Sequence, residues 1–130
     1  MSGRFMAFLA VCVAALALVV PSALSAPAAG TSVQIGKNAA LVAPTQIAVP
    51  VFFQCPQGAT GGVVMSVSQQ QPSGPNTTGS GFIGVACTGA RQMLTVLVNG
   101  GPFNLGPAFA SAEGFSGANF VFDSRVITIG

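Results

Sequence analysis

The sequence predicts an all-β domain, a sandwich or a barrel, that follows an export signal. Three observations support this. Apolar residues alternate with period two beyond about residue 30, which is the spacing of strands with one buried face. Turn residues separate these runs every ~8–12 residues, as in sandwiches and barrels, and the chain holds 17 Gly and 9 Pro. Two of the alternating runs, Gln46–Cys55 and Phe82–Cys87, each end in a cysteine.

The first 28 residues have the organisation of a secretory signal. Met1–Met6 carries a single charge, Ala7–Val20 is continuously apolar, and Pro21 introduces a region of small residues. A transmembrane span needs ~20 apolar residues, so we expect a cleaved signal helix over residues 1–28 and no stable membrane span afterwards. The residue before Cys12 is not small, which argues against a lipoprotein signal.

Signal removal leaves a single domain, residues 29–130, with two cysteines, Cys55 and Cys87. Exported compartments are oxidising, so this even pair is expected to form a disulfide. A reduced pair or a metal site is the alternative, but two thiols without His are too few ligands for structural zinc. If Val63–Gln69 runs antiparallel between the two cysteine-terminated strands, both thiols lie at the same pole.

Eight strands follow from the alternation. We expect them over Ser32–Ile35, Ala39–Ala43, Gln46–Cys55, Val63–Gln69, Ser80–Cys87, Arg91–Val98, Ala108–Gly114 and Phe120–Ile129. Pro50 lacks an N–H donor, which predicts an edge strand or a bulge. Asn99-Gly100 is typical of a tight hairpin turn.

The order of features resembles that of small secreted immunoglobulin-like proteins of actinobacteria. The resemblance covers Val33 to Ile129. It rests on a Val-x-Ile opening, a cysteine closing Val49–Cys55, the segment Val85-Ala86-Cys87-Thr88-Gly89-Ala90 leading into Thr95-Val96-Leu97-Val98, and Asp123-Ser124-Arg125 before the last strand. It implies an immunoglobulin-like antiparallel β-sandwich and no particular activity. Unlike true immunoglobulin domains, the chain has no tryptophan.

The residue types argue against an enzyme, a metal site or a bound cofactor. The chain has no His, and Glu113 and Asp123 are its two acids. A general acid–base pair would require these two to face each other. The simpler interpretation pairs Asp123 with Arg125, or Glu113 with Arg91 or Arg125. A net charge of +2 is too small for a nucleic-acid footprint.

Asn76-Thr77-Thr78 matches the N-glycosylation acceptor. It lies in the polar stretch Gln70–Gly79, where a turn-forming Asn is also expected. We favour the turn, because the chain resembles bacterial proteins.

These features predict a secreted, extracellular or cell-surface module with a structural, adhesive or protein-binding role. Its partner would be a protein or a component of the cell envelope. An extracellular carrier of a small apolar ligand is the alternative, and it would need a pocket lined by phenylalanines. Most phenylalanines are expected in the core. Phe103 lies in a Gly/Pro loop, and Phe52 and Phe109 lie opposite buried positions, so these three predict an exposed binding patch.

Export can be tested by the intact mass of the secreted protein. We expect the mature chain to begin between Ala26 and Gly30, because the small residues there suit signal cleavage. A cell-associated product that retains Ala7–Val20 would contradict the signal.

Overall fold

The computed structural model describes residues 30–130, and the predicted signal lies outside these residues. All eight predicted strands are confirmed, with somewhat different ends. They are β3 (Ser32–Ile35), β4 (Asn38–Ala43), β5 (Gln46–Gln54), β6 (Thr60–Gln69), β7 (Thr77–Ala86), β8 (Gln92–Gly100), β9 (Gly106–Ser116) and β10 (Asn119–Ile129). Within residues 30–130, no helix is long and apolar enough to span a membrane.

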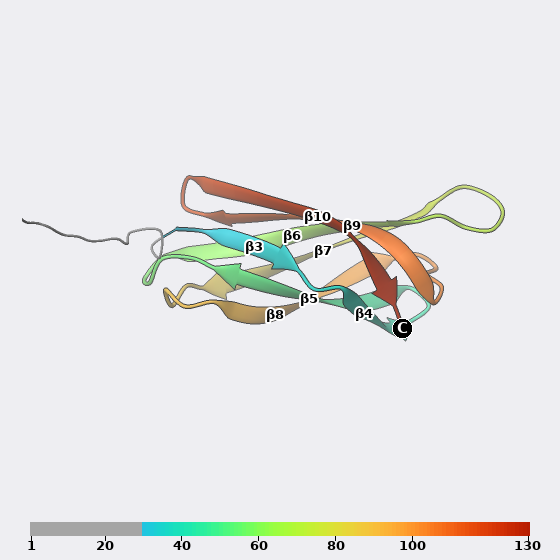
Figure 1. The fold of residues 1–130 in the computed structure, drawn as a ribbon, viewed down its shortest axis with the longest axis horizontal. Helices are drawn as coiled ribbons and strands as arrows, with labels where there is room; N and C mark the ends of the chain where they lie inside the picture. Colours follow the sequence, from blue (N-terminus) through green and yellow to red (C-terminus); the bar gives the residue numbers. More distant parts are fainter. Residues whose placement is uncertain (1–29) are drawn as a thin grey trace, which may run out of the picture. The chain divides into compact units, whose positions relative to one another are not determined.

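The strands form a closed, mixed seven-stranded β-barrel (Figure 1). The order around the ring is β5-β4-β10-β9-β6-β7-β8, and β8 pairs again with β5. β3 pairs with β5 alongside β4. The predicted immunoglobulin-like sandwich is therefore wrong. A sandwich stacks two separate sheets, whereas backbone pairing here continues around the whole ring.

Two short ladders close the barrel. β4 runs parallel to β10 through Asn38 and Ala39, which register with Thr128 and Ile129. β7 runs antiparallel to β8 at Gly79↔Gly100 and Ser80↔Asn99. The remaining pairs in the ring are antiparallel. Each closing ladder involves only two residue pairs, so the alternation of apolar and polar residues within a strand does not predict it.

The interior of the barrel is filled by the predicted inward residues. The inward side chains of β5 and β6 are almost fully buried, namely Ile47, Val49, Val51, Phe53, Val63, Met65 and Val67. β9 supplies smaller inward residues, Ala108, Ala110 and Ala112. A small barrel packed in this way has a solid core.

Phe53 and Phe103 are the two buried phenylalanines of this core, at 0% and 3% exposure. A Cβ placed on Gly114 would lie 2.7 Å from Cε1 of Phe53, so this ring packs directly against the backbone of β9. A Cβ on Gly79 would lie 2.7 Å from Cζ of Phe103. Glycine at both positions makes room for a ring.

Two local predictions need correction, the edge strand or bulge at Pro50 and the hairpin turn at Asn99-Gly100. β5 is an interior strand, and Pro50 lies where β3 gives way to β4, with its carbonyl accepting from Gly36 N at 2.8 Å. In an antiparallel pair the N and O of one residue point to the same neighbour, so the missing donor faces this interruption. Asn99-Gly100 is not a hairpin turn, because β9 pairs with β6 and β10 and not with β8.

The predicted Cys55–Cys87 disulfide is confirmed. The two Cα atoms are 5.2 Å apart, and the bridge joins the ends of β5 and β7 across 32 residues. The flanking loops are also tied together, because Gly89 N donates to the carbonyl of Cys55 at 3.0 Å and Gly58 N to that of Cys87 at 3.2 Å. One pole of the barrel is thereby closed covalently.

Removing the bridge should destabilise the domain. We expect Cys55→Ser to lower the free energy of unfolding by ~2–5 kcal/mol, as loss of a native disulfide does in small secreted domains. Urea unfolding of the oxidised protein and of the variant measures the difference. Free thiols in the non-reduced protein would contradict the pairing.

Candidate functional site

The outward face of β7, β6, β9 and β10 carries an ordered set of side chains. The strand register aligns them in rows across the four strands. In the order β10, β9, β6, β7 the rows are Phe120, Phe115, Gly62, Gly84; Phe122, Glu113, Val64, Phe82; Ser124, Ser111, Ser66, Ser80; and Val126, Phe109, Ser68, Thr78. Two rows rich in aromatic rings are thus followed by a row of four serines.

Four rings at one end of this face form what we name the aromatic cluster: Phe82, Phe115, Phe120 and Phe122. Phe82, Phe120 and Phe122 are 59%, 58% and 71% exposed. The Phe82 and Phe115 rings stack with centroids 6.2 Å apart, and Phe115 and Phe120 are 6.5 Å apart. A Cβ on Gly62 would lie 2.8 Å from Phe82 and 3.0 Å from Phe115, so these rings lie over bare backbone. The result is an exposed apolar surface on a rigid sheet.

Glu113 lies within the aromatic cluster. Its register neighbours are Phe122 on β10 and Val64 on β6. The side chain is half-buried, and within residues 30–130 it has no hydrogen-bond or ion-pair partner. It lines a hollow of about 310 Å³ together with Val64, Ser66, Ser111, Ala112, Phe122 and Ser124. The site therefore offers aromatic rings, hydroxyls and one carboxylate.

The predicted patch of Phe52, Phe103 and Phe109 does not form. Phe103 is buried, contrary to the prediction. Its loop is fastened inward, because Phe103 N donates to the carbonyl of Pro44 at 2.7 Å and Gln69 exchanges hydrogen bonds with the backbone of Asn104 at 2.8 Å.

Phe109 faces outward as predicted, at 49% exposure, but the serine row separates it from the aromatic cluster. Phe52 lies on β5, on the opposite wall of the barrel. The Arg91 guanidinium carbon lies 4.3 Å from the centroid of its ring. Sequence reasoning missed Phe120 and Phe122 as surface residues. The signal was available, because both alternate with Val121 and Asp123 on β10.

Asp123 and Arg125 both bind the backbone of Ile35. The Ile35 amide donates to Asp123 Oδ2 at 2.8 Å, and Arg125 Nη1 donates to the Ile35 carbonyl at 2.9 Å. In the described part of the chain these contacts replace the ion pair predicted between the two side chains. They fasten β3 to β10, which share no backbone ladder. We call this pair of contacts the Ile35 latch.

The two acids lie on opposite faces of the β9–β10 ladder. Glu113 registers with Phe122, which points outward, whereas Asp123 registers with Ala112, which points inward. A carboxylate pair of the kind that glycosidases use cannot form from them. Among the described residues, no group of three or more His, Cys, Asp and Glu could hold a metal ion.

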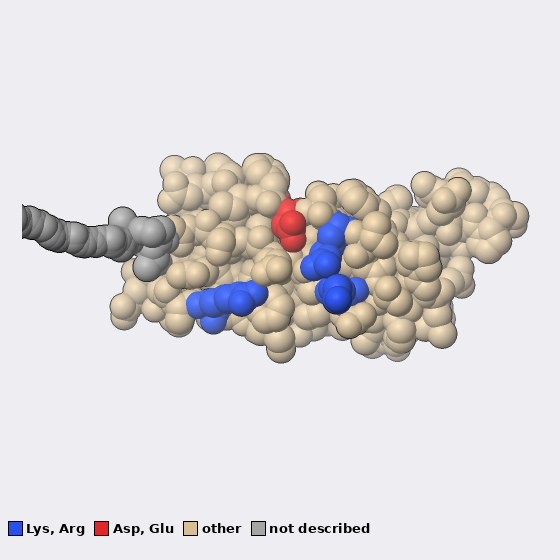
Figure 2. Space-filling model, in the orientation of Figure 1, with Lys and Arg blue, Asp and Glu red and all other residues tan. Residues whose placement is uncertain are grey.

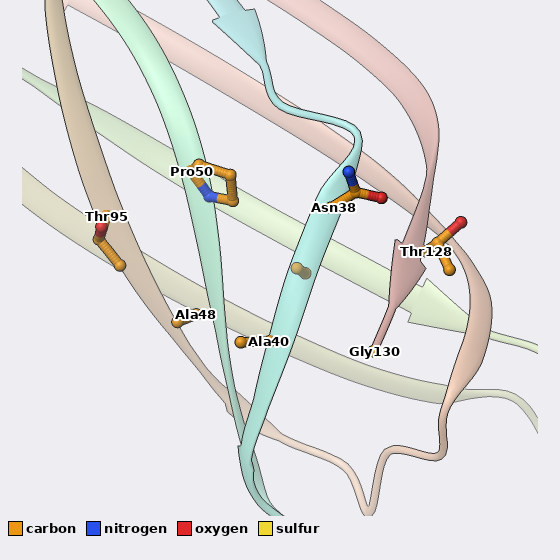
Figure 3. A pocket seen from close by; sticks show the side chains of 8 residues that line it. Asn38, Ala40, Ala48, Pro50, Thr95, Thr128 and Gly130 are labelled. Carbon is orange, nitrogen blue, oxygen red and sulfur yellow. The ribbon is translucent and has the colours of Figure 1, made fainter.

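Two further hollows lie on the surface. One, of about 540 Å³, runs along β4, β5 and β8 and is lined mainly by small side chains, including Ala40, Ala48 and Pro50 (Figure 3). The other, of about 690 Å³, lies beside Phe109 and Val126 under the β6–β7 loop and includes Asn76. Asn76 is exposed in this loop, whose tip extends beyond the strands in Figure 1.

Charge is sparse over the surface. Figure 2 shows a few basic side chains and an acidic one on a face that is otherwise uncharged. Residues 30–130 contain three cations and two acids: Lys37, Arg91, Arg125, Glu113 and Asp123. The net charge of this part is therefore +1.

Comparison with known proteins gives little further information. No protein-family model matches the chain, and no curated protein matches it. Among solved structures, the sporulation control protein Spo0M from Bacillus subtilis aligns with a TM-score of 0.38 at 10% identity. The alignment covers 76% of this chain and 48% of that one, so the chain spans about half the length of Spo0M. A TM-score this low supports no inference about fold or function.

The Ile35 latch can be tested by substitution. We expect Asp123→Ala to lower the free energy of unfolding by ~1–3 kcal/mol, because it leaves the part-buried Ile35 amide without an acceptor. Asp123→Asn keeps an oxygen acceptor and should lose less. Glu113→Gln is the matched control and should change stability by less than ~0.5 kcal/mol, as expected away from structural contacts. Equal stability of Asp123→Ala and Glu113→Gln would contradict the latch.

Proposed function

We propose that the protein is a non-catalytic exported or cell-surface module that binds a protein or cell-envelope partner through the aromatic cluster. Export is supported by the signal-like N-terminus and by the disulfide, which persists in oxidising compartments. A structural, an adhesive and a protein-binding role would each require an exposed contact surface.

The exposure of Phe82, Phe120 and Phe122 is the observation that carries the proposal. Three phenylalanines that are each more than half exposed leave apolar area in water, and covering it contributes ~25 cal/mol per Å². Apolar surface gathered in one place marks contact sites more often than scattered residues do. Aromatic residues are also enriched at the anchoring positions of interfaces.

The carrier of a small apolar ligand has weaker support. The inward positions of the barrel are occupied by packed side chains, so a ligand would have to use a surface hollow. The hollow in Figure 3 is lined mainly by small residues and has no phenylalanine, and the larger hollow under the β6–β7 loop has one, Phe109, among several polar side chains. The structure therefore favours a surface contact over an enclosed ligand.

The proposal is tested with Phe82→Ser/Phe122→Ser. We expect at least a tenfold loss of binding to the envelope fraction of the producing cells, measured by co-sedimentation of the purified disulfide-bonded protein. The thermal midpoint should change little, since both rings are largely exposed. Val42→Ser/Leu105→Ser removes two residues that are 56% and 67% exposed elsewhere and is the matched control. Equal binding by both double variants and the parent would refute a role for the aromatic cluster.

A further inference from the structure

A second surface, on the opposite wall of the barrel, complements the aromatic cluster. Arg91 lies with its guanidinium 4.3 Å from the centroid of the Phe52 ring, and its Nη2 donates to Gln34 Oε1 at 2.8 Å. Met93, which is 66% exposed, registers with Phe52. We name Gln34, Phe52, Arg91 and Met93 the arginine patch. It combines a cation with exposed apolar surface, as the aromatic cluster combines a carboxylate with exposed rings.

Phe53 places the two surfaces at the same level of the barrel. Its neighbour Phe52 points outward into the arginine patch, whereas the Phe53 ring crosses the core and reaches Gly114 on β9. Glu113 and Phe115 flank Gly114 and point outward on the far wall. One inward ring thus connects two outward surfaces that face in opposite directions.

The chemistry of the two surfaces matches. Glu113 is an acceptor with no partner within residues 30–130. A guanidinium has five N–H donors, and the bond to Gln34 uses one nitrogen of Arg91. A hydrogen bond between two ionised groups is about twice as strong as a neutral one. Because Arg91 is already held by Phe52 and Gln34, less side-chain entropy is lost when it binds.

We propose that copies of this chain associate head to tail, with Glu113 of one copy bound to Arg91 of the next. The aromatic cluster then packs on Phe52 and Met93 of the neighbour. This inference rests on the proposed function, because it names the partner of the aromatic cluster. The contact joins two different surfaces, so the interface is heterologous and can repeat into an open chain of molecules. The small net charge of residues 30–130 offers little repulsion against such stacking.

Charge exchange tests the inference directly. The weight-average mass of the disulfide-bonded protein, measured by sedimentation equilibrium, should rise with concentration. Glu113→Arg and Arg91→Glu should each weaken association at least tenfold, because like charges then meet at the contact. The double variant E113R/R91E restores opposite charges at every contact, and so does an equimolar mixture of the two single variants. Both should regain association, which a merely destabilised fold would not do. Lys37→Glu makes the same charge change as Arg91→Glu outside both surfaces and is the control.

A concentration-independent monomer mass would overturn the inference. So would unchanged association of the single variants, or a double variant that stays as weak as they are. If the mass of the protein does not respond to charge exchange while Phe82→Ser/Phe122→Ser loses binding to the envelope fraction, head-to-tail association is refuted and the proposed function stands. If association follows charge exchange but Phe82→Ser/Phe122→Ser still binds the envelope fraction, the envelope role of the cluster fails and the self-contact stands.

Discussion

The buried face of β5 is the constraint on which the rest of the structure depends. Ile47, Val49, Val51 and Phe53 are completely buried, and β5 pairs with β8 along one edge and with β3 and β4 along the other. A slip of one residue would turn this entire set outward, so the register of β5 is strongly fixed. That register carries Cys55 to the pole where the disulfide forms, and it sets the outward positions as firmly as the inward ones.

The interruption between β3 and β4 shows how a nearly uncharged chain uses its charges. β3 does not pair with β10 through the backbone; instead Asp123 accepts from the Ile35 amide and Arg125 donates to the Ile35 carbonyl. Both side chains lie on the inward-facing side of β10, where water screens their hydrogen bonds less. Two of the five charged side chains of residues 30–130 thus close the fold. Glu113 and Arg91 lie on outer walls. Glu113 has no partner among residues 30–130, whereas Arg91 is held in place by Phe52 and Gln34.

Local alternation predicted the strands and most of the core, because side-chain direction in a strand has period two. It could not predict the two short ladders that close the barrel, since these pairings depend on long-range geometry. The burial of Phe103 could not be predicted either, because a Gly/Pro loop is usually exposed. The contacts that hold this loop against the barrel come from Gln69 and Pro44, which are more than 30 residues away in the sequence. For the aromatic cluster, alternation along β10 contained the signal that Phe120 and Phe122 face outward, but the sequence analysis did not use it. The proximity of Phe82 and Phe115 follows only from the cross-strand register.

In the proposed contact between copies, Glu113 gives the aromatic cluster its selectivity. An uninterrupted patch of rings would attract any apolar surface. Covering a carboxylate without a partner costs several kcal/mol even after relaxation, so a surface that lacks a suitable donor is rejected. A surface that carries a guanidinium satisfies the carboxylate and covers the rings in one step. Unpaired charge within an apolar patch thereby raises specificity by penalising wrong partners. The barrel presents a guanidinium of this kind, Arg91, beside apolar Phe52 and Met93, which makes another copy of the chain a partner that meets both requirements.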